Sequence, residues 1–247
     1  MGYIDAHCHL DMCEDVEAII GRAKEKNVDV IVCNGVNPGS NRQVLVFSSK
    51  FKNVKASLGL YPLDALKMSD GEINDELAFI KRNQDKIVAI GEVGIDLKEN
   101  EQLERQKWIF YKILFTAKEL DKPVIVHSRK AEKEVIDILN EEGMKKVVMH
   151  CFSGNFKLIR ECIAKGWYFT IPTSVKHSEH FQLLIKEAPL NQLLCETDSP
   201  YLHPDKLRNN EPANVIESYK MIAEIKGISM NEVVKSIESN YKRLFKE

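Results

Sequence analysis

Short apolar runs alternate with longer amphipathic stretches along the whole chain. The apolar runs are rich in Val and Ile, and several are apolar on both faces, which is typical of strands buried in a parallel sheet. They predict eight strands, at 3–7, 28–33, 54–60, 87–93, 122–127, 146–150, 167–171 and 192–197. The amphipathic stretches predict helices at 15–26, 40–50, 73–84, 101–120, 130–142, 155–165, 178–187, 213–226 and 230–245.

A strand followed by a helix, repeated along the chain, predicts an α/β fold of the (β/α)8 TIM barrel type. That fold typically takes ~250 residues, and this chain has 247. An open, doubly wound parallel sheet is the alternative, but the sequence lacks the G-x-G-x-x-G or P-loop pattern that would favour it. No Pro/Ser-rich linker or block of charge divides the chain, so we expect a single domain over 1–247.

Composition narrows the class of protein. Hydrophobic residues make up 44% and charged residues 29%, which excludes a disordered or fibrous chain. The net charge of −2 argues against binding nucleic acid by bulk positive charge alone, although bound metal ions could supply positive charge locally. There is no run of ~18 apolar residues and no secretory signal at the N-terminus. We therefore expect a cytoplasmic protein without a membrane partner, whose six cysteines are free thiols.

Side chains that bind metals lie at the carboxyl ends of five predicted strands. In a barrel these ends converge on one face, where the chemistry of the fold takes place. His7 and His9 also share one side of their strand, because side chains alternate along a strand. Packed or hydrogen-bonded histidines are the alternative for each site taken alone. Together the six side chains predict a metal site at the barrel mouth: His7, His9, Glu92, His127, His150 and Asp198.

The two carboxylates in this set need compensation. Glu92 lies in an apolar run between two glycines, and burying an unpaired carboxylate is costly. A bridge between two metal ions would compensate it; an Arg or Lys partner from a neighbouring strand is the alternative. Asp198 could bind a metal and take a proton from water, whereas Glu196 could support a ligand histidine.

Other polar residues near the strand ends suit substrate binding. Arg129 and Ser153 are candidates to hold an oxyanion, with Ser128, Lys130 and Gly154 as their neighbours. Three further histidines look different. We expect His177 and His180 to be solvated and His203 to lie near the pocket rim.

Six motifs in order resemble those of the TatD family of metal-dependent deoxyribonucleases, within the amidohydrolase superfamily. They span nearly the whole chain: D-A-H-C-H-L at 5–10, G-E-V-G-I-D at 91–96, P-V-I-V-H-S-R at 123–129, H-C-F-S-G at 150–154, E-T-D-S-P-Y-L at 196–202 and N-E-P-A-N-V at 210–215. The resemblance implies a distorted TIM barrel with two divalent ions. One ion would be held by His7, His9 and Asp198 and the other by His127 and His150, with Glu92 bridging them.

Two positions depart from the family pattern. After the third strand the family usually has G-x-H-P, whereas this chain reads G-L-Y-P with Tyr61. The family also tends to have R-N-E-P, whereas here Asn209 precedes Asn210 and Glu211. Both changes concern expected substrate contacts, so they bear on substrate and rate rather than on metal binding.

The resemblance implies hydrolysis of DNA phosphodiester bonds, with a 3′ end favoured. Two ions would lower the pKa of a shared water, Asp198 would accept its proton, and Tyr61 could donate to the leaving oxygen. The mixed His/carboxylate set suits Zn²⁺, Mn²⁺ or Fe²⁺, and Mg²⁺ could support turnover. We expect single-stranded or terminal nucleotides as substrate, and no obligate protein partner is evident.

Two alternatives remain open from the sequence. The same centre could hydrolyse a carbonyl ester or amide, for example in an aminoacyl-tRNA deacylase, and the neutral phenol at Tyr61 favours this reading. A metal-binding or scaffold protein without catalysis is the second alternative.

Overall fold

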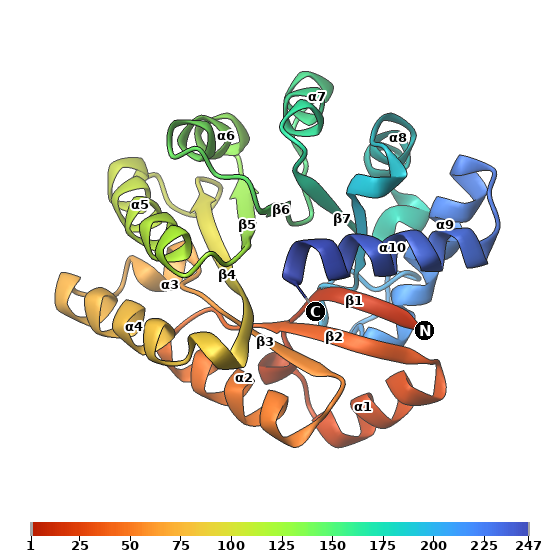
Figure 1. Cartoon of the computed structure of the whole chain (residues 1–247), viewed down its shortest axis with the longest axis horizontal. Helices are drawn as coiled ribbons and strands as arrows, with labels where there is room; N and C mark the ends of the chain where they lie inside the picture. The colour runs from red at the N-terminus through yellow and green to blue at the C-terminus, as the bar shows by residue number, and fades with distance from the viewer. Residues whose placement is uncertain (1, 247) are drawn as a thin grey trace.

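Eight parallel strands in sequence order form the centre of the computed structural model, which describes residues 2–246. The helices surround the strands (Figure 1), so the expected (β/α)8 TIM barrel is confirmed. The strands are β1 (Tyr3–Cys8), β2 (Val28–Asn34), β3 (Val54–Leu58), β4 (Ile87–Asp96), β5 (Val124–Arg129), β6 (Val147–Met149), β7 (Tyr168–Pro172) and β8 (Leu193–Glu196). The helices are α1 (Val16–Glu25), α2 (Pro38–Lys50), α3 (Pro62–Ala65), α4 (Asp70–Arg82), α5 (Leu103–Glu119), α6 (Glu132–Glu141), α7 (Phe156–Ala164), α8 (Glu179–Glu187), α9 (Ile216–Lys226) and α10 (Met230–Phe245).

Each predicted strand and helix overlaps one of these elements, but α3 was not predicted and two strands end two or more residues later than expected. β4 continues to Asp96 and β5 to Arg129, so Glu92 and His127 lie inside their strands rather than at the ends. Pairing between the strands explains the extension, because Gly94 lies opposite His127 and Asp96 opposite Arg129. A Cβ atom on Gly94 would come within 1.9 Å of the His127 carbonyl oxygen, so only glycine allows this close approach.

The strands are continuous apolar runs because they are covered on both sides. All ten residues of β4 are buried, and side chains such as Leu58, Ile90, Val126 and Phe169 have no exposed surface. Strands buried on both faces favour Val and Ile without alternation. The same pattern that predicted the strands therefore also describes the core.

The seam between β8 and β1 is closed partly by side chains. At its carboxyl end, the Asp198 N–H donates to the His7 carbonyl (3.0 Å) and the His9 N–H donates to the Ser199 carbonyl (2.8 Å). Below them, the buried Tyr219 hydroxyl on α9 accepts from the Ile4 N–H at 2.9 Å and donates to the Ile4 carbonyl at 3.2 Å. A phenol from outside the sheet thus satisfies backbone groups of β1 that would otherwise lack a partner.

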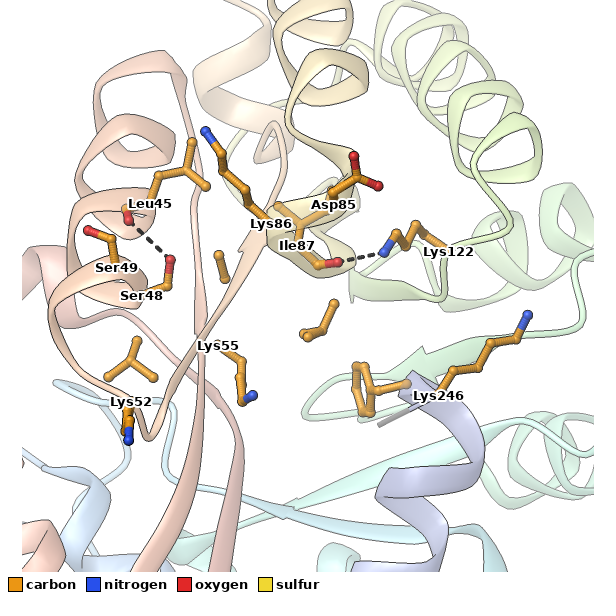
Figure 2. A pocket seen from close by; sticks show the side chains of 14 residues that line it. Leu45, Ser48, Ser49, Lys52, Lys55, Asp85, Lys86, Ile87, Lys122 and Lys246 are labelled. Carbon is orange, nitrogen blue, oxygen red and sulfur yellow. Dashed lines mark hydrogen bonds between the residues drawn. The ribbon is translucent and has the colours of Figure 1, made fainter.

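The amino end of the barrel carries a cavity of about 480 Å³ that is rich in lysine (Figure 2). Lys122 donates from Nζ to the Ile87 carbonyl at 2.6 Å across its upper wall. Among the described residues, those lining this cavity include no histidine, cysteine or glutamate. The predicted metal ligands lie at the opposite end.

Within residues 2–246, no helix is both long and apolar enough to span a bilayer. The cytoplasmic location and the single domain stay predictions. All six cysteines are free thiols, as expected, and four of them are buried.

Replacing Tyr219 by Phe tests the role of the phenol in the seam. The variant leaves the Ile4 N–H buried without its partner, so we expect the free energy of unfolding to fall by about 1–3 kcal/mol. Urea denaturation followed by circular dichroism measures this. The matched control is Tyr111→Phe, which removes the hydroxyl that donates to Glu141 at the surface. It should change the free energy of unfolding by less than about 0.5 kcal/mol. Equal effects of both variants would show that the hydrogen bond between Tyr219 and Ile4 adds no more stability than a surface hydrogen bond.

Candidate metal centre

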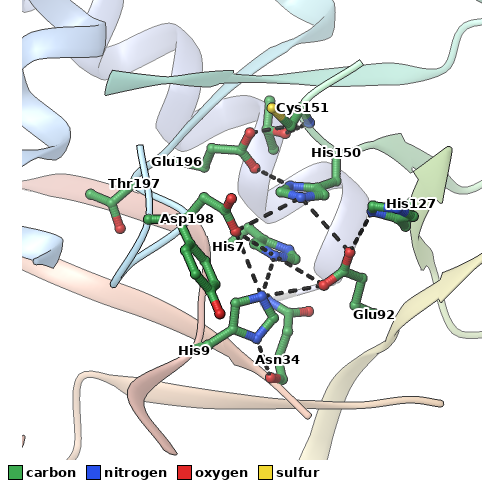
Figure 3. A network of polar contacts seen from close by, with 12 residues as sticks. His7, His9, Asn34, Glu92, His127, His150, Cys151, Glu196, Thr197 and Asp198 are labelled. Carbon is green, nitrogen blue, oxygen red and sulfur yellow. Dashed lines mark hydrogen bonds and ion pairs between the residues drawn. The ribbon is translucent and has the colours of Figure 1, made fainter. Parts of the chain in front are cut away.

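The six predicted donor side chains meet at the carboxyl end of the barrel (Figure 3). His7 and His9 bring their Nε2 atoms to 3.1 Å from each other. Asp198 Oδ1 lies 3.5 Å from Nε2 of His7 and 3.6 Å from Nε2 of His9. These three residues form one group whose donor atoms are close enough to share a metal ion. His7 lies in β1, His9 directly follows it and Asp198 lies in the loop after β8.

Glu92, His127 and His150 form a second such group. Glu92 Oε1 lies 2.9 Å from His127 Nδ1 and 3.9 Å from His150 Nε2. Its other oxygen, Oε2, faces the first group, at 3.2 Å from His9 Nε2 and 3.6 Å from His7 Nε2. Glu92 therefore presents one carboxylate oxygen to each group.

Which groups neutralise the charges of Glu92, which is buried, and Asp198, which is mostly covered, tests whether this set fits a metal. Within the described part of the chain, Glu92 and Asp198 have ion pairs with histidines only. The alternative of an Arg or Lys partner for Glu92 is therefore wrong. Four imidazoles and two carboxylates that point at one another, with nitrogen and oxygen donors only, fit Zn²⁺, Mn²⁺ or Fe²⁺.

Without a metal, protonated histidines supply the positive charge that stabilises the two carboxylates. Burial raises the pKa of Glu92, but hydrogen bonds from His127 and His9 outweigh it, so the pKa lies well below the ordinary value. Burial lowers the pKa of His150, yet the charges of Glu196 and Asp198 raise it to about 9. Metal binding at such a centre has to displace protons.

The outward ring nitrogens of two histidines are held by fixed acceptors. His150 Nδ1 lies 2.7 Å from Glu196 Oε2, and the other oxygen of Glu196 accepts from the Cys151 N–H at 3.1 Å. His9 Nδ1 donates to the Asn34 carbonyl at 3.0 Å. Such partners select the tautomer and orientation of a ligand histidine. Glu196 also falls within a third close group with His7 and His150, but its two oxygens are already occupied by these donors.

Three residues that were not predicted from the sequence support the centre. Asp5 is fully buried and accepts from the Thr197 N–H (2.9 Å) and hydroxyl (2.5 Å), and burial raises its pKa to about 8. Asp96 Oδ2 lies 3.1 Å from His127 Nε2 and accepts from the Tyr61 hydroxyl at 2.9 Å. Alternation along β4 gave a usable signal, because 92 and 96 share one face of the strand. Asn34 acts through its carbonyl, so its residue type carried no signal.

A pocket of about 760 Å³ opens in front of the donors. The three predicted substrate-binding residues, Tyr61, Arg129 and Ser153, all line it. Arg129 Nη1 lies 3.7 Å from Glu99 Oε1, and the Ser153 hydroxyl donates to Glu132 Oε1 at 3.0 Å. Their roles toward a substrate stay predictions.

The remaining candidates lie outside this pocket. His177 is exposed, as expected, but His180 is half-buried because its Nε2 donates to the Phe152 carbonyl at 3.0 Å. The expectation of a solvated His180 is therefore wrong. His203 accepts from the Asp205 N–H at 3.0 Å. Asn209 is exposed and does not line the pocket.

Comparisons with known proteins find similar chains over nearly the whole length of this one. A family model described as TatD related DNase matches residues 4–246. A protein of Homo sapiens named deoxyribonuclease TATDN3 is 35% identical over 99% of this chain and 95% of its own length. A protein of Methanocaldococcus jannaschii named an uncharacterized metal-dependent hydrolase is 38% identical, over 99% of this chain and 97% of its own. The crystal structure of a TatD homolog from Escherichia coli, YJJV, superimposes with a TM-score of 0.94 at 28% identity, covering 99% and 98% of the two chains.

Metal addition after chelation tests the centre directly. We expect Zn²⁺ or Mn²⁺, added to chelator-treated protein at about 100 times its Kd, to stabilise the fold by about 2.7 kcal/mol, a rise in Tm of roughly 5–10 °C. Differential scanning fluorimetry measures this. Glu92→Ala should abolish most of the shift, and K⁺ at matched ionic strength is the control for salt. A Tm of the wild-type protein that does not change on addition of Zn²⁺, Mn²⁺, Fe²⁺ or Mg²⁺ would contradict a metal centre.

Proposed function

The chain belongs to the TatD related DNase family, and we propose that it hydrolyses DNA phosphodiester bonds, acting from a 3′ end, with two bound divalent ions. Family membership makes it a metal-dependent hydrolase that acts on ester bonds. The observation that carries the finer proposal is Glu92, which faces both donor groups at the floor of an open pocket.

The donor groups suit two ions. His7, His9 and Asp198 would hold one, His127 and His150 the other, and Glu92 would contact both. Bound divalent ions make water more acidic and neutralise charge on a phosphoryl oxygen. Zn²⁺, Mn²⁺ and Fe²⁺ fit the imidazole ligands, and Mg²⁺ fits the substrate oxygens.

Two carboxylates of the chain would handle the proton and the water. Asp198 lies next to three histidines and its side chain is 14% exposed, so it can reach a water in the pocket. Burial raises the pKa of Asp198, but the charge of His150 and hydrogen bonds from His7 and His9 outweigh it and lower the pKa. Asp198 is thus ionised near neutral pH and would accept the proton of the attacking water. Glu92 would orient that water.

Basic and hydroxyl groups that line the pocket suit a phosphate. Arg129 has a side chain 44% exposed and lines the pocket together with Lys67 and Ser153. A guanidinium can hold two phosphate oxygens at once. Tyr61 lines the same pocket and would contact the sugar-phosphate through its ring.

An exposed apolar pair that lines the same pocket suits an unpaired base. Tyr201 is 55% exposed and Met12 41%, and the Tyr201 hydroxyl contacts Met12 Sδ at 3.7 Å. An exposed aromatic ring in a pocket that also carries basic side chains is a pattern that binds single-stranded nucleic acid by stacking. The net charge of −2 argues for contacts to a few terminal nucleotides rather than to a long duplex.

A 3′-labelled single-stranded oligonucleotide tests the proposed reaction. We expect release of terminal nucleotides that requires an added divalent metal, and a 10²–10⁴-fold lower kcat for Asp198→Asn because the proton acceptor is lost. A 5′-labelled copy of the same oligonucleotide distinguishes exonuclease from endonuclease cleavage.

The same preparation should be assayed on carbonyl esters, including aminoacyl-tRNA. Metal-dependent ester hydrolysis without nucleotide release would replace the nuclease proposal by the ester or amide alternative. Wild-type protein that binds metal but hydrolyses neither substrate would support the scaffold alternative.

The exposed ring of Tyr201 gives a second test. We expect Tyr201→Ala to lower kcat/KM on single-stranded DNA by roughly 5- to 150-fold, since stacking contributes about 1–3 kcal/mol per base. The loss should fall mainly on KM. Phe115→Ala is the matched control, because Phe115 is an equally exposed aromatic ring on α5, outside the pocket. Unchanged kcat/KM in Tyr201→Ala would remove this residue from the binding site.

A further inference from the structure

The imidazole of His127 lies between two carboxylates, one at each ring nitrogen. Nδ1 is 2.9 Å from Glu92 Oε1, and Nε2 is 3.1 Å from Asp96 Oδ2. Glu92 belongs to the candidate metal centre, whereas Asp96 lies behind the ring and is fully buried. The nitrogen that faces the centre is therefore Nδ1, and its availability depends on what holds Nε2.

Asp96 is surrounded by hydrogen-bond donors. Its Oδ1 accepts from the Lys98 N–H at 2.9 Å and the Glu99 N–H at 3.4 Å. Its Oδ2 accepts from the Tyr61 hydroxyl at 2.9 Å and lies next to His127 Nε2. A carboxylate in this position acts only as an acceptor, so the hydrogen between it and His127 belongs to Nε2.

We propose that Asp96, held by the Tyr61 hydroxyl, is a positioning residue that keeps a hydrogen of His127 on Nε2. Nδ1, which donates to Glu92 while it is protonated, is then the nitrogen that a metal would bind once that proton is displaced. The inference rests on the proposed metal-dependent function and deepens it. It also gives Tyr61 a role of its own, because the one proton of the phenol is donated to Asp96. The ring of Tyr61 meets that of His127 edge to face, with centroids 5.0 Å apart, and so restricts its rotation.

Asp96→Asn separates positioning from packing, because the amide has nearly the same shape as the carboxyl group. The two backbone N–H groups at Oδ1 would retain the amide oxygen, so the amide nitrogen would point at His127. His127 Nε2 would then have to accept, and its hydrogen would move to Nδ1, where it blocks a metal. Tyr61→Phe removes only the phenol donor and leaves the carboxylate in place.

The test compares zinc binding and the histidine tautomer in these variants. Competition with a chromophoric chelator measures Zn²⁺ affinity, and long-range ¹H–¹⁵N NMR spectra report which nitrogen of His127 carries hydrogen. We expect Asp96→Asn to weaken Zn²⁺ binding about 10- to 100-fold with loss of the Nε2 hydrogen. Tyr61→Phe should weaken binding about two- to tenfold with the tautomer retained, because one hydrogen bond is lost.

Matched controls are Asp121→Asn, which alters a carboxylate paired with Lys146 at the surface, and Tyr111→Phe. Both should keep wild-type Zn²⁺ affinity. Lower thermal stability of Asp96→Asn with wild-type Zn²⁺ affinity and an intact Nε2 hydrogen would overturn the inference while leaving the proposed function standing. Wild-type protein that binds no Zn²⁺ would overturn the proposed function as well. If Asp96→Asn does not fold, wild-type affinity in Tyr61→Phe is the result that refutes the role of the phenol.

Discussion

Two carboxylates without a lysine or arginine partner, one buried and one mostly covered, set the main constraint on this molecule. Glu92 and Asp198 face only histidines among the described residues, and a carboxylate removed from water needs positive charge nearby. Protons on the imidazoles can supply that charge, and metal ions can supply more of it. The arrangement therefore suits a centre that binds cations.

Closure of the barrel and assembly of the centre depend on the same bonds. The Asp198 N–H donates to the His7 carbonyl across the β1–β8 seam, and this bond places the two side chains 3.5 Å apart. Asp5, two residues before His7, accepts from Thr197, the residue before Asp198. A seam joined at these points cannot slip by one residue without turning His7 away from the pocket, because alternate residues of a strand face opposite sides. The register of the last strand pair is thus also the geometry of the first donor group.

Much of this was predictable because the signals are local. Strands covered on both faces are apolar throughout, and the donors lie at or near strand ends, where barrel chemistry lies. The support around the donors was not predictable in the same way. Tyr61 and Asp96 are far apart along the chain and meet only when β3 lies beside β4. The strand β4 was expected to stop at 93, so Asp96 was assigned to a loop although it ends the strand. His180 was expected to be solvated because its neighbours are polar, yet tertiary packing brings it to the Phe152 carbonyl.

The outward nitrogens of the histidines make the two donor groups chemically unequal. In the first group, His9 donates to a neutral carbonyl, and His7 Nδ1 is buried without a hydrogen-bond partner among the described residues. In the second group, His127 and His150 each face a carboxylate behind the ring. A carboxylate partner makes an imidazole a stronger electron donor to whatever its other nitrogen binds. Glu92 gives one oxygen to each group, so it does not distinguish them. The additional carboxylates, Asp96 and Glu196, lie behind the second group and are fully buried, out of reach of a substrate. The carboxylates behind His127 and His150 can therefore strengthen cation binding while they stay on the side of the rings that an anionic substrate does not contact.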